Sequence, residues 1–366
     1  MSTGITINKS NLQFSAITRH LSPAWFASVM GTAVIPLALS FINHPLVTPA
    51  AMVFVSLSVF MFVVTLIPWA AKFIVYPAEI SKDFNHPIAA NFYPTMPISL
   101  IIFALDFLKF PTLFFSEAVS LSLAYYLWLA GSVGIYGMGF YILLQIFRNR
   151  GIDLVHANFG WYIPPVSKLI IPVAGFELAQ LYPETIELTF GLSIISLGVG
   201  FFLFLFVGAA VFHRYIYHDL PMSRFAATFF IGLAPTAIIA VILFKMMHLF
   251  EAQTILGIDP HVFSPLAKLA ILFNWGLSGW WFIMALVIMG YYIRRVELPY
   301  ALSWWAFTFP SGALAVSSGV AWKVTNFSSI YFFYIIAIMF LLIVWAVVFA
   351  RTGKGMITGE IFAPSH

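Results

Sequence analysis

Five basic side chains stand within or at the ends of long apolar stretches, where a charge is costly. They are Lys109, Lys168, Arg224, Lys245 and Lys323. Charged residues in such stretches often mark the path of an ion or substrate, and a cationic side chain there attracts anions and repels cations. Each could equally be an ordinary helix-end residue whose charged group reaches the membrane surface. The set predicts recognition of an anion by charge, and the second interpretation stays open.

Prolines divide the apolar stretches into two classes. Each odd-numbered stretch has a proline near its middle and no even-numbered stretch does; these prolines are Pro36, Pro97, Pro172, Pro235 and Pro310. Such a proline removes a backbone hydrogen bond, leaves a carbonyl without its donor and bends the helix. Exposed to lipid that arrangement is costly, so kinked helices belong inside the bundle. The alternation predicts five tandem helical hairpins, although proline is also common in membrane helices generally.

The prolines and the basic residues together predict a central path with two mouths. Lys109, Lys245 and Lys323 follow the prolines of their stretches at distances that place them roughly 15 to 20 Å outward along a helix. Lys168 and Arg224 take the equivalent place on the opposite side. We therefore expect anion-attracting mouths at both ends. Because the odd stretches are rich in Phe, Ala, Gly, Ser and Thr, we expect an apolar constriction between them.

The elements that must position these residues are transmembrane helices. The chain has 366 residues, 62% hydrophobic and 8% charged, against roughly a quarter charged in a typical soluble domain. Ten apolar stretches are each long enough to cross the membrane as a helix. They cover residues 22–42, 49–71, 93–108, 117–147, 163–181, 186–212, 224–250, 264–293, 299–322 and 328–350. The sequence thus predicts an all-α integral membrane protein with ten transmembrane helices, its inner ring of kinked odd helices surrounding a central pore.

The distribution of Lys and Arg predicts the orientation. Most basic residues flank the termini and the connections on the same side, which by the positive-inside rule is the cytoplasm. We expect a cytoplasmic N-terminal segment at 1–21, a transmembrane domain at 22–350 and a cytoplasmic tail at 351–366. The expected location is the plasma membrane, or the inner membrane of a bacterial cell.

The sequence does not contain the residues that other classes of function require. The chain has no cysteine, which excludes disulfides and thiolate chemistry. No histidines are spaced as a metal-binding box, and no phosphate-binding loop occurs. The basic residues are scattered singly, without the patch that nucleic-acid binding needs. We expect no enzyme activity, no metal, no cofactor and no nucleic-acid partner.

Four strings resemble one known family. These are LSPAWFASVMGTAVIP in the first stretch, HPIAANFYPTMPIS before the third, IPPV before the fifth and YALSWWAFTFPSGALA in the ninth. They resemble the tellurite-resistance/dicarboxylate transporter (TDT) family, which includes the bacterial tellurite-resistance protein and the slow-type anion channels of plants. The resemblance covers nearly the whole chain, and the first and last strings are quite specific.

The resemblance implies more than the residues do alone. It implies five hairpins with quasi-fivefold symmetry around a pore, assembly as a homotrimer, and a pore gate formed by a phenylalanine beside the proline of the ninth helix. That gate corresponds to Phe309, with Phe307 as the fallback, whereas packing in the core or against lipid is the ordinary role of a phenylalanine.

The expected function is transport of a small anion across the lipid bilayer by a channel or transporter with a Phe-gated pore. Two alternatives stay open: a proton-coupled carrier of four-carbon dicarboxylates such as malate, and an efflux protein for tellurite or sulfite. A proton-coupled carrier would use a carboxylate in mid-membrane. Asp106 and Glu177 instead lie toward the outer ends of their stretches, which mildly favours a channel.

Overall fold

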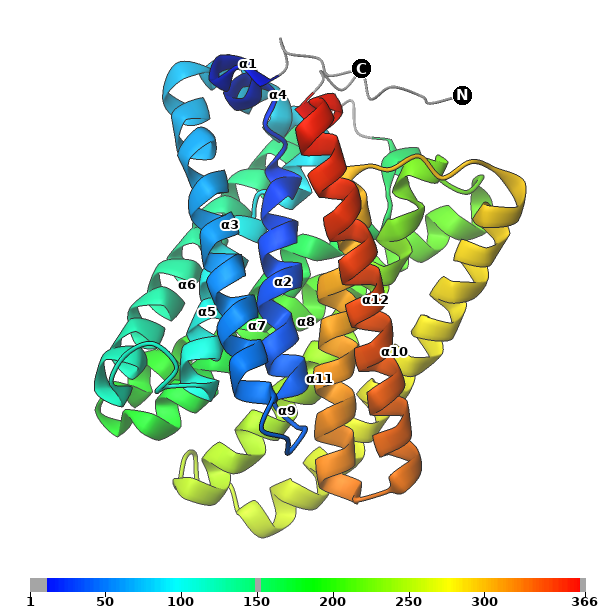
Figure 1. The fold of residues 1–366 in the computed structure, drawn as a ribbon. Helices are drawn as coiled ribbons and strands as arrows, with labels where there is room; N and C mark the ends of the chain where they lie inside the picture. The colour runs from blue at the N-terminus through cyan, green and yellow to red at the C-terminus, as the bar shows by residue number, and fades with distance from the viewer. Residues whose placement is uncertain (1–11, 149–152, 363–366) are drawn as a thin grey trace.

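The computed structural model describes residues 12–148 and 153–362, which form helices and no strand. Five inner helices are α2 (Phe26–Leu39), α5 (Thr95–Lys109), α7 (Ile163–Leu181), α9 (Ala234–Ala252) and α11 (Thr308–Thr325). Five longer outer helices are α3 (Val47–Val75), α6 (Glu117–Arg148), α8 (Ile186–Tyr217), α10 (Pro260–Arg295) and α12 (Ser328–Thr358). Two short helices, α1 (Phe14–His20) and α4 (Pro77–Asn85), lie at one end of the bundle (Figure 1).

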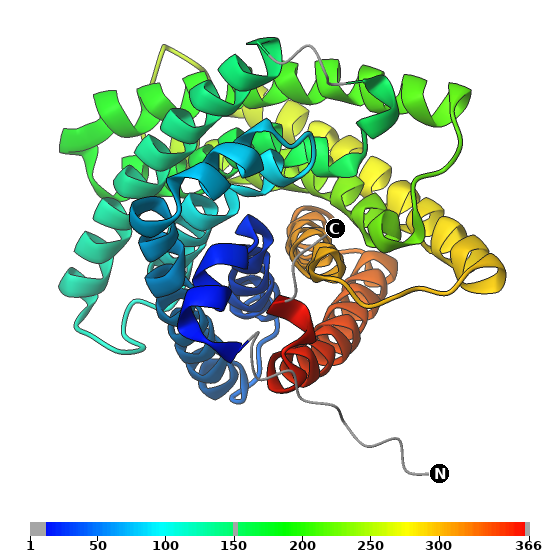
Figure 2. The same ribbon diagram turned by 90° about the horizontal axis from the view of Figure 1, so that it is seen from above.

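The inner helices form a closed ring in chain order. α2 packs on α5, α5 on α7, α7 on α9, α9 on α11, and α11 returns to α2. Figure 2 looks along this bundle, with α2 in blue and α11 in orange side by side. The inner ring of proline-bearing helices is therefore present, while quasi-fivefold symmetry stays a prediction.

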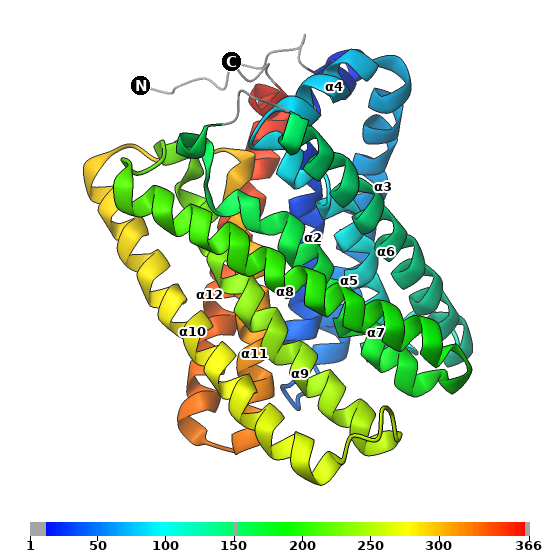
Figure 3. The same ribbon diagram turned by 180° about the vertical axis from the view of Figure 1, so that it is seen from behind.

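Each outer helix packs on the inner helix that precedes it in the chain, which gives five antiparallel hairpins (Figure 3). Burial separates the two classes. In the most apolar part of the inner span Ala89–Lys109, 83% of residues are buried, against 17% in the outer span Pro183–Tyr217. The outer helices expose large apolar side chains such as Phe60, Phe206 and Phe273, as expected for surfaces that face lipid.

The number of spans is supported in part. Among the described residues, seven helices are long and apolar enough to cross a membrane, or eight if α1 and Pro23–Leu39, bent by 93°, count as one span. The remaining two of the predicted ten are α7 and α11. Both lie in the inner ring, where protein replaces lipid as the surroundings, so they tolerate a more polar composition. Ten spans remain our prediction.

The prolines do not all lie in mid-helix, which corrects the sequence-based expectation. Pro36 and Pro172 are inside α2 and α7. Pro97, Pro235 and Pro310 instead occupy the first turn of α5, α9 and α11, where proline is well tolerated.

Short 3-10 helices precede the inner helices and form a second closed ring. They are η2 (Pro23–Trp25), η3 (Ala89–Phe92), η5 (Phe159–Tyr162), η7 (Ser223–Leu233) and η8 (Leu302–Phe307), each in contact with the next. In a 3-10 helix each carbonyl accepts a hydrogen bond from the N–H group three residues later, in place of the fourth. The carbonyl four residues before a proline therefore does not depend on the N–H group that proline lacks. The carbonyls of Tyr93 and Ile231 accept from Met96 and Ala234 in this way. These two carbonyls are therefore satisfied, contrary to expectation.

Side chains of the last hairpin lock it to the first. The hydroxyl of Tyr334 on α12 donates to the carbonyl of Ala38 at 2.7 Å. The indole of Trp345 donates to the hydroxyl of Thr32 at 3.0 Å.

α12 continues to Thr358, eight residues beyond the expected end of the transmembrane domain at 350. The last described element, η9 (Glu360–Phe362), also meets η2, since the rings of Trp25 and Phe362 stack with centroids 5.6 Å apart.

Glycine permits the closest approach in the inner ring, where α2 meets α11. A β-carbon at Gly31 would overlap the hydroxyl of Thr308, and one at Gly312 would overlap Val34. Neither glycine has unusual backbone angles, so close packing is the reason for the small residue.

We predict that Gly31→Ala lowers the thermal unfolding temperature of the purified protein in detergent. The added methyl group has no free volume, and overpacking costs about 1–3 kcal/mol. Gly276→Ala on outer helix α10 is the matched control, because no atom lies within 4 Å of its new β-carbon. Equal melting temperatures for Gly31→Ala and the control would contradict the proposed tight contact.

Candidate functional site

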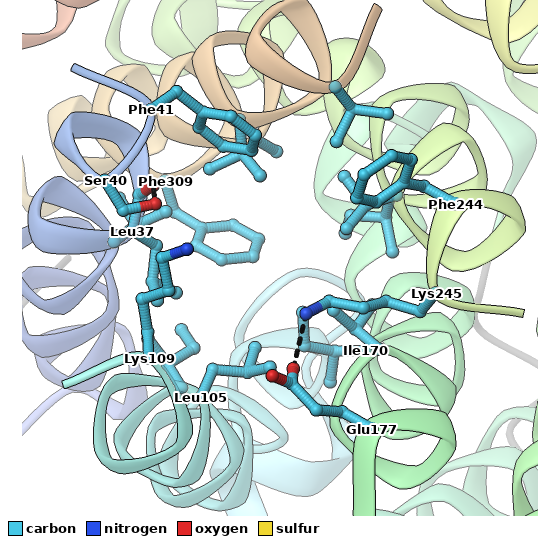
Figure 4. Close-up of a pocket in the computed structure, with 18 residues that line it drawn as sticks. Leu37, Ser40, Phe41, Leu105, Lys109, Ile170, Glu177, Phe244, Lys245 and Phe309 are labelled. Atoms are coloured by element: carbon cyan, nitrogen blue, oxygen red, sulfur yellow. Dashed lines mark hydrogen bonds and ion pairs between the residues drawn. The ribbon is translucent and has the colours of Figure 1, made fainter. Parts of the chain in front are cut away.

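All five inner helices contribute to one cavity inside the ring, of about 130 Å³ (Figure 4). Its lining side chains are Val34, Leu37, Ser40, Phe41, Ile102, Leu105, Lys109, Ile170, Val173, Glu177, Ile238, Val241, Phe244, Lys245, Phe309, Ala313, Val316 and Val320. Most of them are aliphatic or aromatic. A molecule in this cavity therefore meets an apolar wall with only a few polar groups.

The lining residues contributed by four of the inner helices, α2, α5, α7 and α9, share one spacing, with Phe41 just past the end of α2. In α5 they are Ile102, Leu105 and Lys109, which lie on one face because side chains three, four and seven residues apart align along a helix. The same triplet recurs after 68 residues in α7, whose last member is Glu177, and after another 68 in α9, whose last member is Lys245. It also precedes α5 by 68 residues in α2. A common register thus brings the charged ends of α5, α7 and α9 to one level.

Three charged side chains stand at that level. The ammonium group of Lys245 forms an ion pair with the carboxylate of Glu177, drawn as a dashed line in Figure 4. Lys109 reaches into the same cavity, with its Nζ atom 6.0 Å from the centre of the Phe41 ring. Two ammonium groups and one carboxylate leave a net charge of +1 when all three are ionised. That excess favours a small anion over a cation.

The ring of Phe309 projects into the cavity (Figure 4), and the residue is only 6% exposed. Phe307, the fallback for the gate, does not line the cavity. Its ring instead packs edge-on against Phe230, with centroids 4.8 Å apart. The geometry therefore favours Phe309 as the residue that could obstruct the path.

The other basic residues lie elsewhere. Lys323 is exposed, with its Nζ atom 4.9 Å from the Trp322 ring, and it interacts with Lys109 electrostatically without lining the cavity. Lys168 does not face the ring interior. It lines a separate groove between α6, α7 and α8, so our placement of Lys168 at a mouth of the central path was wrong.

Arg224 lies at the 3-10 end of the ring. It is exposed, and its carbonyl accepts from the hydroxyl of Ser303 at 2.5 Å, which joins η7 to η8. Desolvation lowers the pKa of the nearby His86 imidazole; Asp83 opposes this effect, and the positive charges of His156 and Arg224 reinforce it. Sequence reasoning placed Arg224 at this end but missed the histidines beside it.

Sequence reasoning also missed the role of Glu177 as the partner of Lys245 and did not identify the aliphatic lining. The 68-residue recurrence of the lining triplet could have revealed both, since it holds from α2 to α9. The prolines drew attention to a less regular repeat. Among the described residues, no group of three His, Cys, Asp or Glu side chains could hold a metal ion.

Known proteins resemble this chain over most of its length. The family model described as voltage-dependent anion channel matches residues 20–353. A protein of Methanocaldococcus jannaschii named as an uncharacterized transporter is 32% identical over 349 residues, covering 94% of this chain and 96% of the relative. The malic acid transport protein of Schizosaccharomyces pombe is 23% identical, covering 83% and 71%. A sulfite efflux pump of Arthroderma benhamiae is 23% identical, covering 94% and 92%.

Proposed function

Because this chain belongs to the voltage-dependent anion channel family, we propose that its inner ring conducts small anions through the central cavity and that Phe309 closes this path. The family makes the chain a multi-pass membrane transporter or channel for anions, and not an enzyme. The observation that carries the finer proposal is the cavity itself: all five inner helices line it, it holds excess positive charge, and one phenylalanine ring projects into it.

An anion enters at the level of Lys109 and Lys245. Their charges raise the local concentration of anions, and the effect weakens as salt screens them. Beyond this level the wall is aliphatic, so the anion finds few groups that could hold it tightly. Weak binding suits conduction, because an ion that binds too tightly cannot leave.

The position of the Phe309 ring inside the cavity is consistent with a closed state of the proposed path. The ring belongs to α11, immediately before Pro310 in the first turn of the helix. A bulky apolar group in an apolar passage excludes water as well as ions, and a hydrated ion does not cross a dry constriction. Rotation of this ring, or movement of the start of α11, would open the path.

Proton-coupled transport of a dicarboxylate is the second candidate, and two carboxylates favour it. Glu177 lines the cavity, where it can meet both a proton and the substrate. Both carboxylate oxygens of Asp106 are buried without a hydrogen-bond partner among the described residues. A malic acid transport protein and sulfite efflux pumps are among the relatives; tellurite efflux rests on the sequence resemblance alone.

We also propose assembly as a homotrimer in the plasma membrane, or the bacterial inner membrane, with both termini in the cytoplasm. The trimer rests on the family resemblance and the orientation on the excess of Lys and Arg on that side. The two ends of the described chain lie at the same end of the bundle, which supports termini on a single side (Figure 1).

We predict that Phe309→Ala raises the anion conductance of the protein in planar bilayers by roughly tenfold or more, because it removes an apolar plug from the passage. Phe307→Ala is the matched control, since it deletes the same ring outside the cavity. Unchanged conductance in correctly inserted Phe309→Ala, or an equal rise in both variants, would exclude Phe309 as the gate.

A charge series tests the role of the cavity. Glu177→Gln raises its net charge from +1 to +2, and Lys109→Met lowers it to 0. We expect the anion-over-cation permeability ratio to rise in the first and fall in the second. Each step should be roughly fivefold at low salt, as about 1 kcal/mol of interaction gives. Lys268→Met, an exposed lysine on the outer helix α10, should change it little. Reversal potentials in salt gradients measure the permeability ratio. If the ratios of the variants do not follow the net charge of the cavity, the proposed pathway is refuted.

A pH gradient separates the two candidate functions. In liposomes containing the purified protein, a channel gives reversal potentials for chloride, nitrate, sulfite and malate that do not depend on the proton gradient. A proton-coupled carrier gives malate uptake driven by an inward proton gradient, and Asp106→Asn or Glu177→Gln should abolish that coupling. We expect the channel result. Uptake of malate against its own gradient would establish the carrier.

A further inference from the structure

A second hollow of the molecule lies on its outer surface, away from the central cavity. It is a groove of about 620 Å³ on the flank of α7, bounded by α6 and α8, with contributions from η3 and η5 at its end. Both outer helices pack on α7, and the groove lies where they leave its first turns uncovered. Its rim includes Phe140 and Phe202, which are 70% and 56% exposed, as on a surface that faces acyl chains.

Lys168 is the one charged residue that lines this groove, and it is only 5% exposed. The ion pairs of the described residues leave it without a carboxylate. Among the described residues, its Nζ atom donates one long hydrogen bond, at 3.4 Å, to the hydroxyl of the adjacent Ser167. A β-carbon at Gly139 of α6 would overlap the ammonium group, so that glycine makes room for it.

The remaining polar groups of the groove are already satisfied. The hydroxyl of Tyr136 bonds to that of Ser196 at 3.0 Å, the amide of Asn91 donates to the carbonyl of Pro87, and the indole of Trp161 donates to the same carbonyl. A buried ammonium ion without a counter-charge is costly. An anionic group beside Lys168 would offset that cost.

The lipid-facing outer helices of a second copy offer no carboxylate near Lys168. Along the outer helices α3, α6, α8, α10 and α12, the only acidic residues are Glu117 and Glu187, both in first turns. Both precede the stretches of α6 and α8 that line the groove, and Glu117 is far along α6 from Gly139, which the ammonium group of Lys168 contacts. A neighbouring subunit seated here would present apolar side chains to Lys168 and leave the charge unpaired.

We propose that this groove binds an anionic phospholipid, whose phosphate accepts a hydrogen bond from Lys168 and whose acyl chain lies along the apolar wall. Lys168 is about 8 Å along the axis from the start of α7, at 1.5 Å per residue, so a head group can reach it from the near membrane surface. Helical side chains also point toward the N-terminus, which brings the ammonium group closer to that surface.

The site differs from the proposed anion path in both residues and occupant. It uses α6, the outer flank of α7, and α8, with η3 and η5 at its end, whereas α7 lines the central cavity through Ile170, Val173 and Glu177. A lipid bound to one face of α7 thus contacts a helix whose other face forms the passage.

Native mass spectrometry of the purified protein tests the proposal, with phosphatidylglycerol and phosphatidylcholine titrated separately and inorganic phosphate as a third arm. The wild type should bind phosphatidylglycerol more tightly than phosphatidylcholine and should not bind phosphate. Lys168→Met should weaken phosphatidylglycerol about tenfold, to the level of phosphatidylcholine, since a charge-assisted bond is lost. Lys268→Met, an exposed lysine on α10, is the matched control and should bind as the wild type does.

Gly198→Leu is a second variant that leaves the lysine in place. Its new side chain enters open space in the groove, so it should weaken both lipids. This variant decides the matter if Lys168→Met fails to fold. Unaltered lipid preference in Lys168→Met overturns the proposal, as does unaltered lipid binding in Gly198→Leu. Phosphate binding without lipid binding would show a free-anion site, and loss of oligomers without a change in lipid preference would show a subunit interface; both results also overturn it.

Discussion

The constraint on which the structure depends is that hydrocarbon offers no hydrogen-bond partner to the backbone. Each proline in an apolar helix breaks the regular pattern of donors and acceptors, so the segment around it needs protein on every side. The chain meets this requirement by placing the helices of the five repeated prolines in a ring and covering them with five longer helices, of which α3 and α10 also contain a proline, Pro68 and Pro265. Where three of the prolines stand at a helix start, a 3-10 segment supplies shorter-range bonds. The passage follows from this arrangement, because five helices in a closed ring leave a space along their common axis.

The arrangement could be predicted because proline position and hydropathy are properties of single residues and short windows. Pro36 and Pro172 lie inside inner helices as expected, and Phe309 could be chosen because of the family string around Pro310. Other features depend on the rotation of each helix. Lys168 and Glu177 both belong to α7, yet one faces an outer groove and the other the central cavity. Successive residues of a helix point about 100° apart. Because α7 is apolar on all its faces, its sequence does not show which face is turned to the central cavity.

The register of the lining residues links the separate hairpins. Triplets recur every 68 residues from α2 to α9, and this interval, more regular than that of the prolines, places equivalent positions of different helices at one level. Such regularity is expected if each hairpin is one structural unit that buries its face only against its neighbours. Replacing an aliphatic member by a charged one, as in α5, α7 and α9, then changes the electrostatics of the cavity without changing its walls. The repeated hairpin determines where the lining residues stand, and the residue type at the last position of each triplet determines the charge of the cavity.

The balance of those charges explains why Glu177 belongs in a cavity that attracts anions. Two unpaired lysines in an apolar passage would bind an anion strongly, since charges interact more strongly away from bulk water. Strong attraction favours entry and opposes exit. The ion pair with Glu177 neutralises Lys245, so that Lys109 retains the excess charge and an arriving anion must compete with a carboxylate for the second lysine. In the proposed channel, binding would then be weak enough for release, and the remaining positive charge would still exclude cations. A partly neutralised pair of lysines thus serves passage better than two free lysines would.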